Sequence, residues 1–396
     1  MSLKHDNDLT SFALLPELRL RKFIPLKPWG VGLAVEKTSN FEVCPKCANI
    51  SHAVYDRRSV RIRDEPIRGK AVILFITKRR FSCKACGSVF TEPVPGISKY
   101  GKFTKRFEKA LCWAADRFSS MADVEKQFRC STGKCFNAAF GELKRRIKSR
   151  RYPLPSAIGI DEHSLRKPKY QATQYSTIIV DHDNHRVYDL LDDRSKAGVA
   201  EALGKCDGKD RVKFVTMDMS SIYRAAVREA LPGATIVADR FHVQRLLNRA
   251  LNKERLRATG HKRKHPARKL VLRNVENLNF EDRHQLRDWL SAYPKAKELW
   301  EYKEMLRRMY RAKARSVAEK IFEALVARMQ TSKLRKARSL AATLSEWKSE
   351  ILAYHMGRLS NGRTEGFNRV AKLVQREGFG YRSFSNYRER LLNRCF

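Results

Sequence analysis

Acidic residues are scarce in this 396-residue sequence, which holds 42 Asp and Glu against 82 Lys and Arg and has a formal net charge of +40. The excess is not confined to one tail, because basic clusters recur at 78–80, 144–146, 262–264, 307–308 and 333–338. A compact chain with this excess repels itself unless a polyanion neutralises it. The composition therefore predicts a polyanionic partner, and nucleic acid fits an excess this widely spread.

Long hydrophobic runs are also missing, since none approaches the roughly 18 residues that cross a bilayer. Residues 1–30 are too charged for a signal peptide. The nine cysteines are an odd number, which argues for a reducing compartment and against a disulfide framework. These absences argue against a membrane partner and predict a cytoplasmic, nucleoid-associated protein.

The pattern of the chain predicts several domains of mixed α+β and α/β class. Residues 1–40 form an N-terminal segment without a clear hydrophobic periodicity. Residues 41–96 are strand-rich, and Pro93, Pro95 and Gly96 mark the end of this segment. Residues 103–150 change to a helical period. From 155 onward strands and helices alternate, with strands expected at 157–161, 174–181, 185–191, 212–218 and 234–239.

Two C-x-x-C units lie in the strand-rich segment, Cys44-Pro-Lys-Cys47 and Cys83-Lys-Ala-Cys86. Two such knuckles supply the four thiolates of a closed structural zinc site, and a β-hairpin would bridge the 35 residues between them. Two unrelated thiol pairs are the alternative. The surroundings are basic, so Arg79 and Arg80 are candidates for phosphate contact.

The segment 103–150 has the size of a helix-turn-helix domain, with three short helices. Its third helix carries Lys134 and ends in the basic run Lys144, Arg145 and Arg146, which would contact phosphates. A plain helical linker would show the same pattern.

Three acidic residues stand where a metal site is built. Asp161 and Asp218 end apolar, strand-like runs, and Glu365 opens a helical stretch after a Ser-Asn-Gly turn. Strand ends of an α/β sheet bring distant residues together, and three carboxylates suffice to hold magnesium against a phosphodiester. Acids at strand ends also cap the following helix, so position alone leaves both interpretations open.

The chain resembles bacterial insertion-sequence transposases of the "IS L-three" family, within the DDE superfamily. The match runs from about residue 14 to the C-terminus, and the tail motif around Glu365 is its most specific part. The motifs that carry the resemblance are Arg63-Asp-Glu-Pro66, Gly159-Ile-Asp161-Glu-His-Ser, Val215-Thr-Met-Asp218-Met-Ser, Ala238-Asp239-Arg-Phe-His242, Ser360-Asn-Gly-Arg-Thr-Glu365-Gly-Phe-Asn368 and Gly378-Phe-Gly-Tyr-Arg-Ser-Phe.

This resemblance implies a ribonuclease-H-like catalytic core over 155–396 in which Asp161, Asp218 and Glu365 bind Mg²⁺ or Mn²⁺. It also implies an accessory role for His242 at the scissile phosphate. By position alone Asp239 ends a strand of its own and can replace Asp218. Arg363 and Arg369 are expected to reach phosphates.

Asp218 and Glu365 lie 147 positions apart, so the largely helical residues 255–350 are interpreted as an insertion in the core. The expected function is a DNA transposase that binds the terminal inverted repeats of an insertion sequence and catalyses strand cleavage and transfer. It would assemble on DNA as a dimer or larger. The alternatives are a non-catalytic DNA-binding regulator and a stand-alone nuclease of the same fold.

Overall fold

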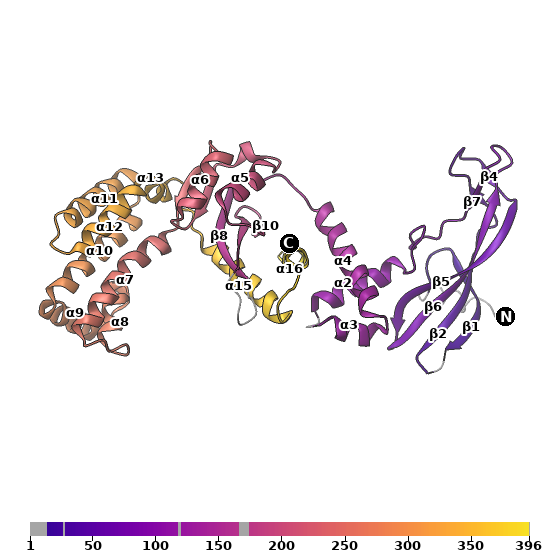
Figure 1. Cartoon of the computed structure of the whole chain (residues 1–396), viewed down its shortest axis with the longest axis horizontal. Helices are drawn as coiled ribbons and strands as arrows, with labels where there is room; N and C mark the ends of the chain where they lie inside the picture. The colour runs from indigo at the N-terminus through magenta and orange to yellow at the C-terminus, as the bar shows by residue number, and fades with distance from the viewer. Residues whose placement is uncertain (1–13, 27, 118–119, 166–173, 396) are drawn as a thin grey trace. The chain divides into compact units, whose positions relative to one another are not determined.

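The computed structural model describes residues 14–26, 28–117, 120–165 and 174–395, so the first 13 residues of the expected N-terminal segment lie outside it (Figure 1). The chain divides into two compact units. Unit 1 comprises residues 1–150 and 376–394, and unit 2 comprises 151–375 with the last two residues. In the part of the chain that is described, no helix is both long and apolar enough to cross a membrane.

Unit 1 is built on a twisted five-stranded sheet with the order β1-β2-β6-β5, in which β7 also pairs with β6. Strands β2 and β6 are parallel, and the other pairs are antiparallel. Alternate residues of β6, such as Leu74 and Ile76, are buried against Val35 of β2. The strands are β1 (Leu18–Leu26), β2 (Gly30–Lys37), β5 (Val54–Ile67), β6 (Lys70–Ser82) and β7 (Val89–Thr91), with a small hairpin of β3 (Glu42–Val43) and β4 (Ile50–Ser51).

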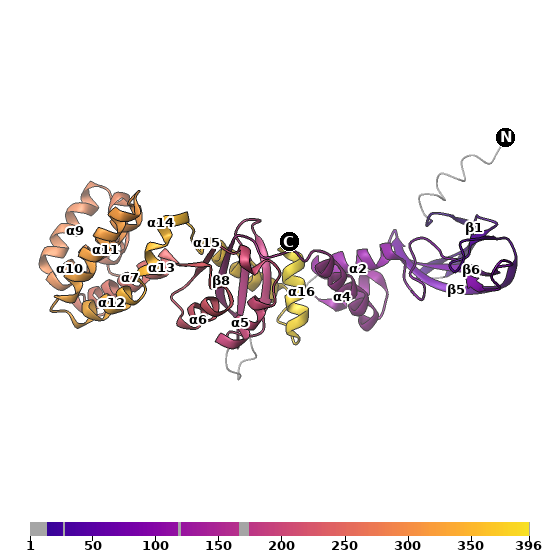
Figure 2. The same cartoon turned by 90° about the horizontal axis from the view of Figure 1, so that it is seen from above.

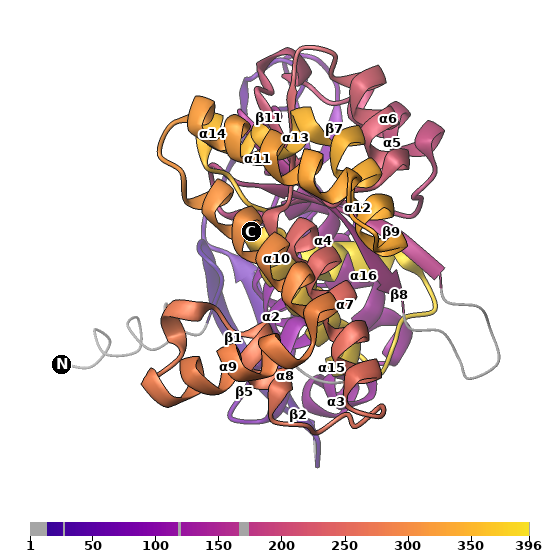
Figure 3. The same ribbon diagram turned by 90° about the vertical axis from the view of Figure 1, so that its left-hand side faces the viewer.

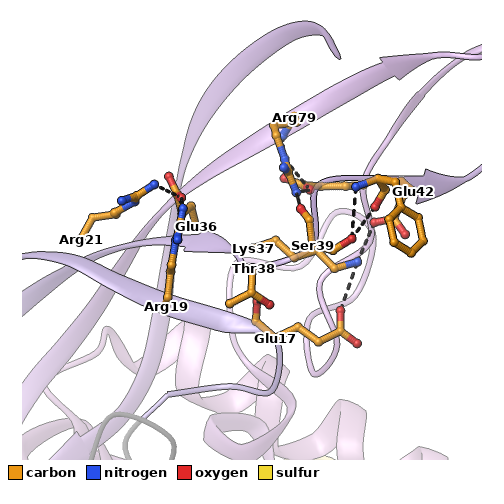
Figure 4. Close-up of polar contacts among 11 residues, drawn as sticks. Glu17, Arg19, Arg21, Glu36, Lys37, Thr38, Ser39, Glu42 and Arg79 are labelled. Carbon is orange, nitrogen blue, oxygen red and sulfur yellow. Dashed lines mark hydrogen bonds and ion pairs between the residues drawn. The ribbon is translucent and has the colours of Figure 1, made fainter. Parts of the chain in front are cut away.

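Residues 14–40 thus belong to the sheet of the strand-rich segment, although their sequence showed no clear period. Ion pairs hold this corner together (Figure 4). Lys37 is buried and its ammonium donates to Glu42 at 2.6 Å, while Arg19 donates from Nε to Glu36 at 2.9 Å. The pairing of β2 with β6 joins segments about 40 residues apart, so local periodicity did not predict it.

The three helices expected in 103–150 are confirmed as α2 (Lys105–Arg117), α3 (Met121–Phe128) and α4 (Thr132–Ser149). Helix α3 begins where the Ser120 side chain accepts from the Asp123 amide, and it ends at Arg129, whose φ is +49°. The three helices share a core of Phe107, Leu111 and Val124. Helix α16 (Phe384–Arg394) packs on α4, so this part of the expected catalytic domain belongs to unit 1.

Two adjacent residues of β5 join the sheet of unit 1 to its helices. Asp64 is 1% exposed and accepts from Thr104 Oγ1 at 2.7 Å and from Arg106 Nε at 2.8 Å. Arg63 donates from Nη2 to the carbonyls of Phe128 and Arg129 at 2.9 Å each, at the end of α3. The Arg63-Asp64 motif is therefore the joint that fixes the helices against the sheet.

Unit 2 contains a second five-stranded sheet with the order β10-β9-β8-β11-β12. Strands β8, β9 and β10 are antiparallel, whereas β8, β11 and β12 are parallel. All five expected strands are confirmed, as β8 (Ala157–Leu165), β9 (Gln174–Asp181), β10 (Arg186–Leu191), β11 (Phe214–Met217) and β12 (Thr235–Ala238). This mixed sheet is the α/β core that the ribonuclease-H-like expectation requires.

Helices cover both faces of this sheet. The apolar sides of α5 (Lys196–Gly204) and α6 (Ser221–Ala230) pack on Ile158, Ile160 and Val215, and a 3₁₀ turn (Lys209–Arg211) precedes β11. Helix α15 (Gly362–Glu377) approaches the opposite side, where the odd-numbered residues of β8 point (Figure 1). The alternation of β8 thus separates an apolar face from a polar one.

The expected helical insertion is a bundle of helices (Figure 2). Its core is continuous with residues of β12. Helix α10 lies alongside α7 (Figure 3). Tyr302, Phe322 and Trp347 fill the interior. The elements are α7 (Arg240–Ala258), α8 (Ala267–Leu272), a 3₁₀ turn (Val275–Asn277), α9 (Phe280–Ala292), α10 (Pro294–Arg311), α11 (Arg315–Gln330), α12 (Arg335–Glu346), α13 (Lys348–Leu352) and α14 (Tyr354–Gly357).

Replacing Asp64 by Ala should destabilise unit 1 by about 3–5 kcal/mol, because Arg106 and Thr104 lose a buried partner. Urea unfolding followed by circular dichroism measures this change. The matched control is Asp56→Ala, since Asp56 pairs with Arg80 at the surface and solvent screens that pair. Equal effects of the two substitutions would show that Asp64 is not the joint.

Candidate functional site

Four sulfur atoms in unit 1 form a tight cluster. The Sγ atoms of Cys44, Cys47, Cys83 and Cys86 all lie within 4.8 Å of one another, with Cys44–Cys86 at 3.7 Å and Cys47–Cys83 at 3.5 Å. A zinc ion with four bonds of about 2.3 Å places tetrahedral sulfurs about 3.8 Å apart. The donor set therefore fits structural zinc and leaves no position open for substrate.

Each pair of cysteines sits on the same type of turn. The Ala48 amide donates to the Cys44 carbonyl at 2.9 Å, and the Gly87 amide donates to the Cys83 carbonyl at 2.8 Å. Both turn residues have positive φ, +59° at Ala48 and +69° at Gly87. The backbone thus bends so that two thiols point to one centre, and the glycine suits the bend better than the alanine.

Three aspartates stand side by side at the ends of the parallel strands of unit 2. Met217 pairs with Ile160 of β8 and with Ala238 of β12, so Asp161, Asp218 and Asp239 follow in register. Asp239 is already engaged, because its carboxylate accepts from the Asn361 amide at 3.2 Å and contacts His242 Nδ1 at 3.1 Å. Asp161 also has partners, since its Oδ1 accepts from the Glu162 backbone amide at 2.8 Å and its Oδ2 from Asn368, whereas Asp218 has a buried oxygen with no hydrogen-bond partner among the described residues. Asp161 and Asp218, on the adjacent strands β8 and β11, form the candidate pair for a cation.

The electrostatics of this pair favour a cation. Burial raises the pKa of Asp218 to about 6, and the negative charge of Asp161 acts in the same direction. Burial also raises the pKa of Asp161. One oxygen of Asp218, Oδ1, is buried with no hydrogen-bond partner among the described residues. A divalent cation between the two carboxylates would satisfy this oxygen and relieve the repulsion.

Asp161 is oriented by a chain of buried side chains. Asn368 on α15 donates from Nδ2 to Asp161 Oδ2 at 2.7 Å, and its Oδ1 lies 2.9 Å from His163 Nδ1. Gln375 Nε2 lies 3.0 Å from the other ring nitrogen of His163. Burial lowers the pKa of His163 to about 4, so the ring is neutral and donates from Nδ1 to Asn368. Sequence analysis did not assign His163 or Gln375 to the site.

Helix α15 is held at its start by a second polar network. Asn361 donates from Nδ2 to the Ile160 carbonyl at 3.3 Å and accepts from Thr216 Oγ1 at 2.9 Å. His182 Nε2 contacts the same hydroxyl at 2.7 Å. A Cβ on Gly159 would lie 2.1 Å from Thr364 Oγ1, so only glycine lets the helix come this close. Gly159 belongs to the motif Gly159-Ile-Asp161, but the sequence did not indicate its role, which depends on the contact with Thr364.

Glu365 lies in the first turn of α15 but does not join the aspartates. Its carboxylate accepts from Arg369 Nη2 at 2.9 Å, and half of its side chain is exposed. Within the described residues, the only group of three or more acid, histidine or cysteine ligands within 4.8 Å is the cysteine cluster. The structure thus brings Asp161 and Asp218 together and leaves Glu365 at the rim.

His242 begins α7 next to the three aspartates. The hydrogen bond to Asp239 raises the pKa of His242, and the charges of Asp218 and Asp161 add to this effect. About a third of its side chain is exposed. The ring is therefore a partly accessible donor beside the carboxylates, suited to an anionic group.

Most cations expected to contact phosphate have acidic or carbonyl partners. Arg79 donates to buried Glu92 and to the Ser39 carbonyl, and only 15% of its side chain is exposed (Figure 4). Its guanidinium therefore stabilises the fold of unit 1. Arg80 binds Asp56. The remaining partners are Glu389 for Lys144, Glu108 and Glu142 for Arg145, Glu142 for Arg146, the His182 carbonyl for Arg363 and Glu365 for Arg369. Lys134 differs, because it is exposed and has no ion-pair partner among the described residues.

Substituting Gly159 by Ala should push α15 away from β8 and destabilise unit 2 by about 1–3 kcal/mol through overpacking. Gly204→Ala in α5 is the control, because nothing lies within 4 Å of a Cβ there. Urea unfolding of both variants measures the difference. A Gly159→Ala protein as stable as the control would show that the approach of α15 is not tight.

Chelation of zinc, or Cys47→Ser, should unfold the knuckles of unit 1, because its four ligands are held together by the metal. Atomic absorption should find one zinc per wild-type chain and less in this variant, with a lower melting temperature. Cys206→Ser, outside the cluster, should keep full zinc content. A metal-free wild type with an unchanged melting curve would refute the assignment.

Comparison with known proteins finds two families that match this chain. A family described as "Transposase" matches residues 158–391, which is more than half of the chain, and "zinc-finger of transposase IS204/IS1001/IS1096/IS1165" matches residues 41–86. The chain is 23% identical over 363 residues to the transposase for insertion sequence element IS1001 of Bordetella parapertussis, covering 89% of this chain and 88% of that protein.

A second relative is the transposase for insertion sequence element IS1557 of Mycobacterium tuberculosis. It is 24% identical over 338 residues, covering 77% of this chain and 74% of that protein. The zinc-finger match contains all four clustered cysteines, and the larger match contains both aspartates and Glu365. The chain therefore belongs to the "IS L-three" family of DDE transposases.

Proposed function

We propose that this transposase uses Asp161, Asp218 and Glu365 to hold divalent metal and to cut and rejoin DNA at the ends of an insertion sequence. The observation that carries the proposal is the pair of adjacent, half-buried carboxylates, one of which has an oxygen without a protein partner. Hydrolysis would free a 3′-hydroxyl at the element end. That hydroxyl would then attack target DNA, so neither step needs a nucleophile from the protein.

The two aspartates fit Mg²⁺ or Mn²⁺, because hard cations prefer carboxylate oxygens. When bound, the metal stabilises the charge on the attacking and leaving oxygens of an in-line displacement. Asn368 orients Asp161 through Oδ2 and the Glu162 backbone amide donates to Oδ1, so a bound metal would share these oxygens with their donors. Glu365 would complete the site by releasing Arg369 and turning toward the aspartates, since it already stands in the first turn of α15.

His242 would contact the scissile phosphate. Its ring lies beside the aspartates, and Asp239 keeps it oriented through Nδ1 and favours the protonated form. Asp239 therefore supports the histidine and the start of α15 instead of replacing Asp218. This division of work is supported by the two partners of Asp239, which are a ring nitrogen and a backbone amide.

Unit 1 would recognise the terminal inverted repeats. Its sheet and its three helices are joined by Arg63 and Asp64, so they would bind DNA together, with the exposed Lys134 on α4 near the bases or phosphates. Joining two ends requires two active sites, so we expect a dimer or larger assembly on DNA. The protein would act at the nucleoid in the bacterial cytoplasm.

Replacing Asp161 or Asp218 by Asn should lower the rate of Mg²⁺-dependent nicking of an end-containing duplex at least about 10³-fold, because the metal site loses a charged ligand. Binding to the same duplex should persist. Gel assays of nicking and of strand transfer, with a pre-cleaved 3′-hydroxyl end, measure the two steps. Asp210→Asn is the control, since Asp210 is an exposed acid of the same unit.

Nicking that survives both substitutions would refute this site. Nicking without transfer of the pre-cleaved end would instead indicate a nuclease, and binding without either reaction would indicate a regulator.

A further inference from the structure

The helical insertion contains a groove of about 740 Å³ between α7, α10 and α12. These three helices belong to one packed bundle, so the groove is a feature of unit 2 by itself (Figure 2). None of its lining residues belongs to the candidate catalytic site. The basic residues along it are Arg249, Lys253, Arg257, Lys295, Arg335 and Lys336, and all six are exposed.

Most cations of this basic groove are not neutralised by the described residues of the protein. Among the described residues, Glu254 is the only acid that lines the groove, and its carboxylate lies 3.3 Å from Arg257. The other five cations have no ion-pair partner in the described part of the chain. Some other cations of the insertion are paired, as Arg307 is with Glu304 at 2.7 Å and Lys348 with Glu323 at 2.8 Å.

The arrangement of the cations adds to their effect. Arg249, Lys253 and Arg257 follow at intervals of four residues, which places them on one face of α7 about 6 Å apart. Lys295 and Arg335 lie in the first turns of α10 and α12, and neither of these two turns contains an acidic residue. Helix dipoles favour anions at these ends, so cations there cost stability unless an anion binds.

We infer that this basic groove binds the phosphate backbone of duplex DNA, away from the reacting bond. A protein partner fits less well, because two of the four leucines that line the groove, Leu299 and Leu340, are only 3% exposed and lysine is depleted in protein interfaces. Protein–DNA interfaces are instead strongly positive. The inference rests on the proposed function, since it gives the duplex that the enzyme cuts a second place of contact.

The test is the salt dependence of duplex binding by the full-length protein. Each phosphate contact adds about 0.9 to the slope of log affinity against log salt. The triple variant Arg249→Gln, Lys253→Gln, Lys336→Gln should therefore make this slope shallower, reducing its magnitude by about 2.7. Binding to a 30-base-pair duplex of unrelated sequence is measured by fluorescence anisotropy between about 50 and 200 mM KCl.

The matched control removes the same charge from three cations of unit 2 that already have acidic partners: Lys205→Gln, Arg328→Gln, Lys348→Gln. Its slope should change by less than about 1, because these cations are not free to replace counterions. Thermal melts of both variants check that folding is unchanged, as expected for surface substitutions.

A groove variant with the slope of the wild type overturns the inference, while normal nicking by the wild type would leave the proposed function intact. If the wild-type chain neither binds nor nicks duplex DNA, the proposed function itself fails. Sedimentation of the same variants covers the alternative occupant. Loss of self-association with an unchanged slope would assign the groove to a second copy of the chain and also overturn the inference.

Discussion

The close approach of α15 to β8 is the contact on which the candidate active site depends. It requires a residue without a side chain at Gly159, because Thr364 occupies the space that a Cβ would need. Once the helix is there, Asn361 anchors its start to Ile160 and Asn368 reaches Asp161. The same helix carries Glu365. A shift of this one contact would move the orienting amide and the third acid together.

The scarcity of acids has a structural counterpart, because many of the acids present are committed to specific partners. Asp64 holds the helices of unit 1 to its sheet, Glu92 holds Arg79, and Asp239 holds His242. Asp218 differs from these three, because it has a buried oxygen with no hydrogen-bond partner among the described residues. Where acids are absent, as along the basic groove, positive charge is left for an outside anion. The distribution of the acids therefore separates structural ion pairs from surfaces that await DNA or metal.

The sequence predicted the strands of unit 2 and the three helices of unit 1 well, because each has a clear period and sits between turn residues. It predicted less for residues 14–40, where β2 pairs with the distant β6. It assigned the segment up to residue 396 to the catalytic domain, whereas α16 packs on α4. Such pairings depend on residues far apart in the chain, and local patterns do not report them.

By itself the sequence determined the chemistry available: two cysteine knuckles, acids at strand ends and a large basic excess. The family resemblance selected Asp218 over Asp239, and only the tertiary structure supplied a physical reason. Strands β8, β11 and β12 place Asp161, Asp218 and Asp239 in register in that order, and it is the packing of α15 and α7 that occupies Asp239 and leaves Asp218 open. Folding likewise decided which basic side chains form ion pairs and which stay exposed without an acidic partner, since many of the partners come from distant parts of the chain.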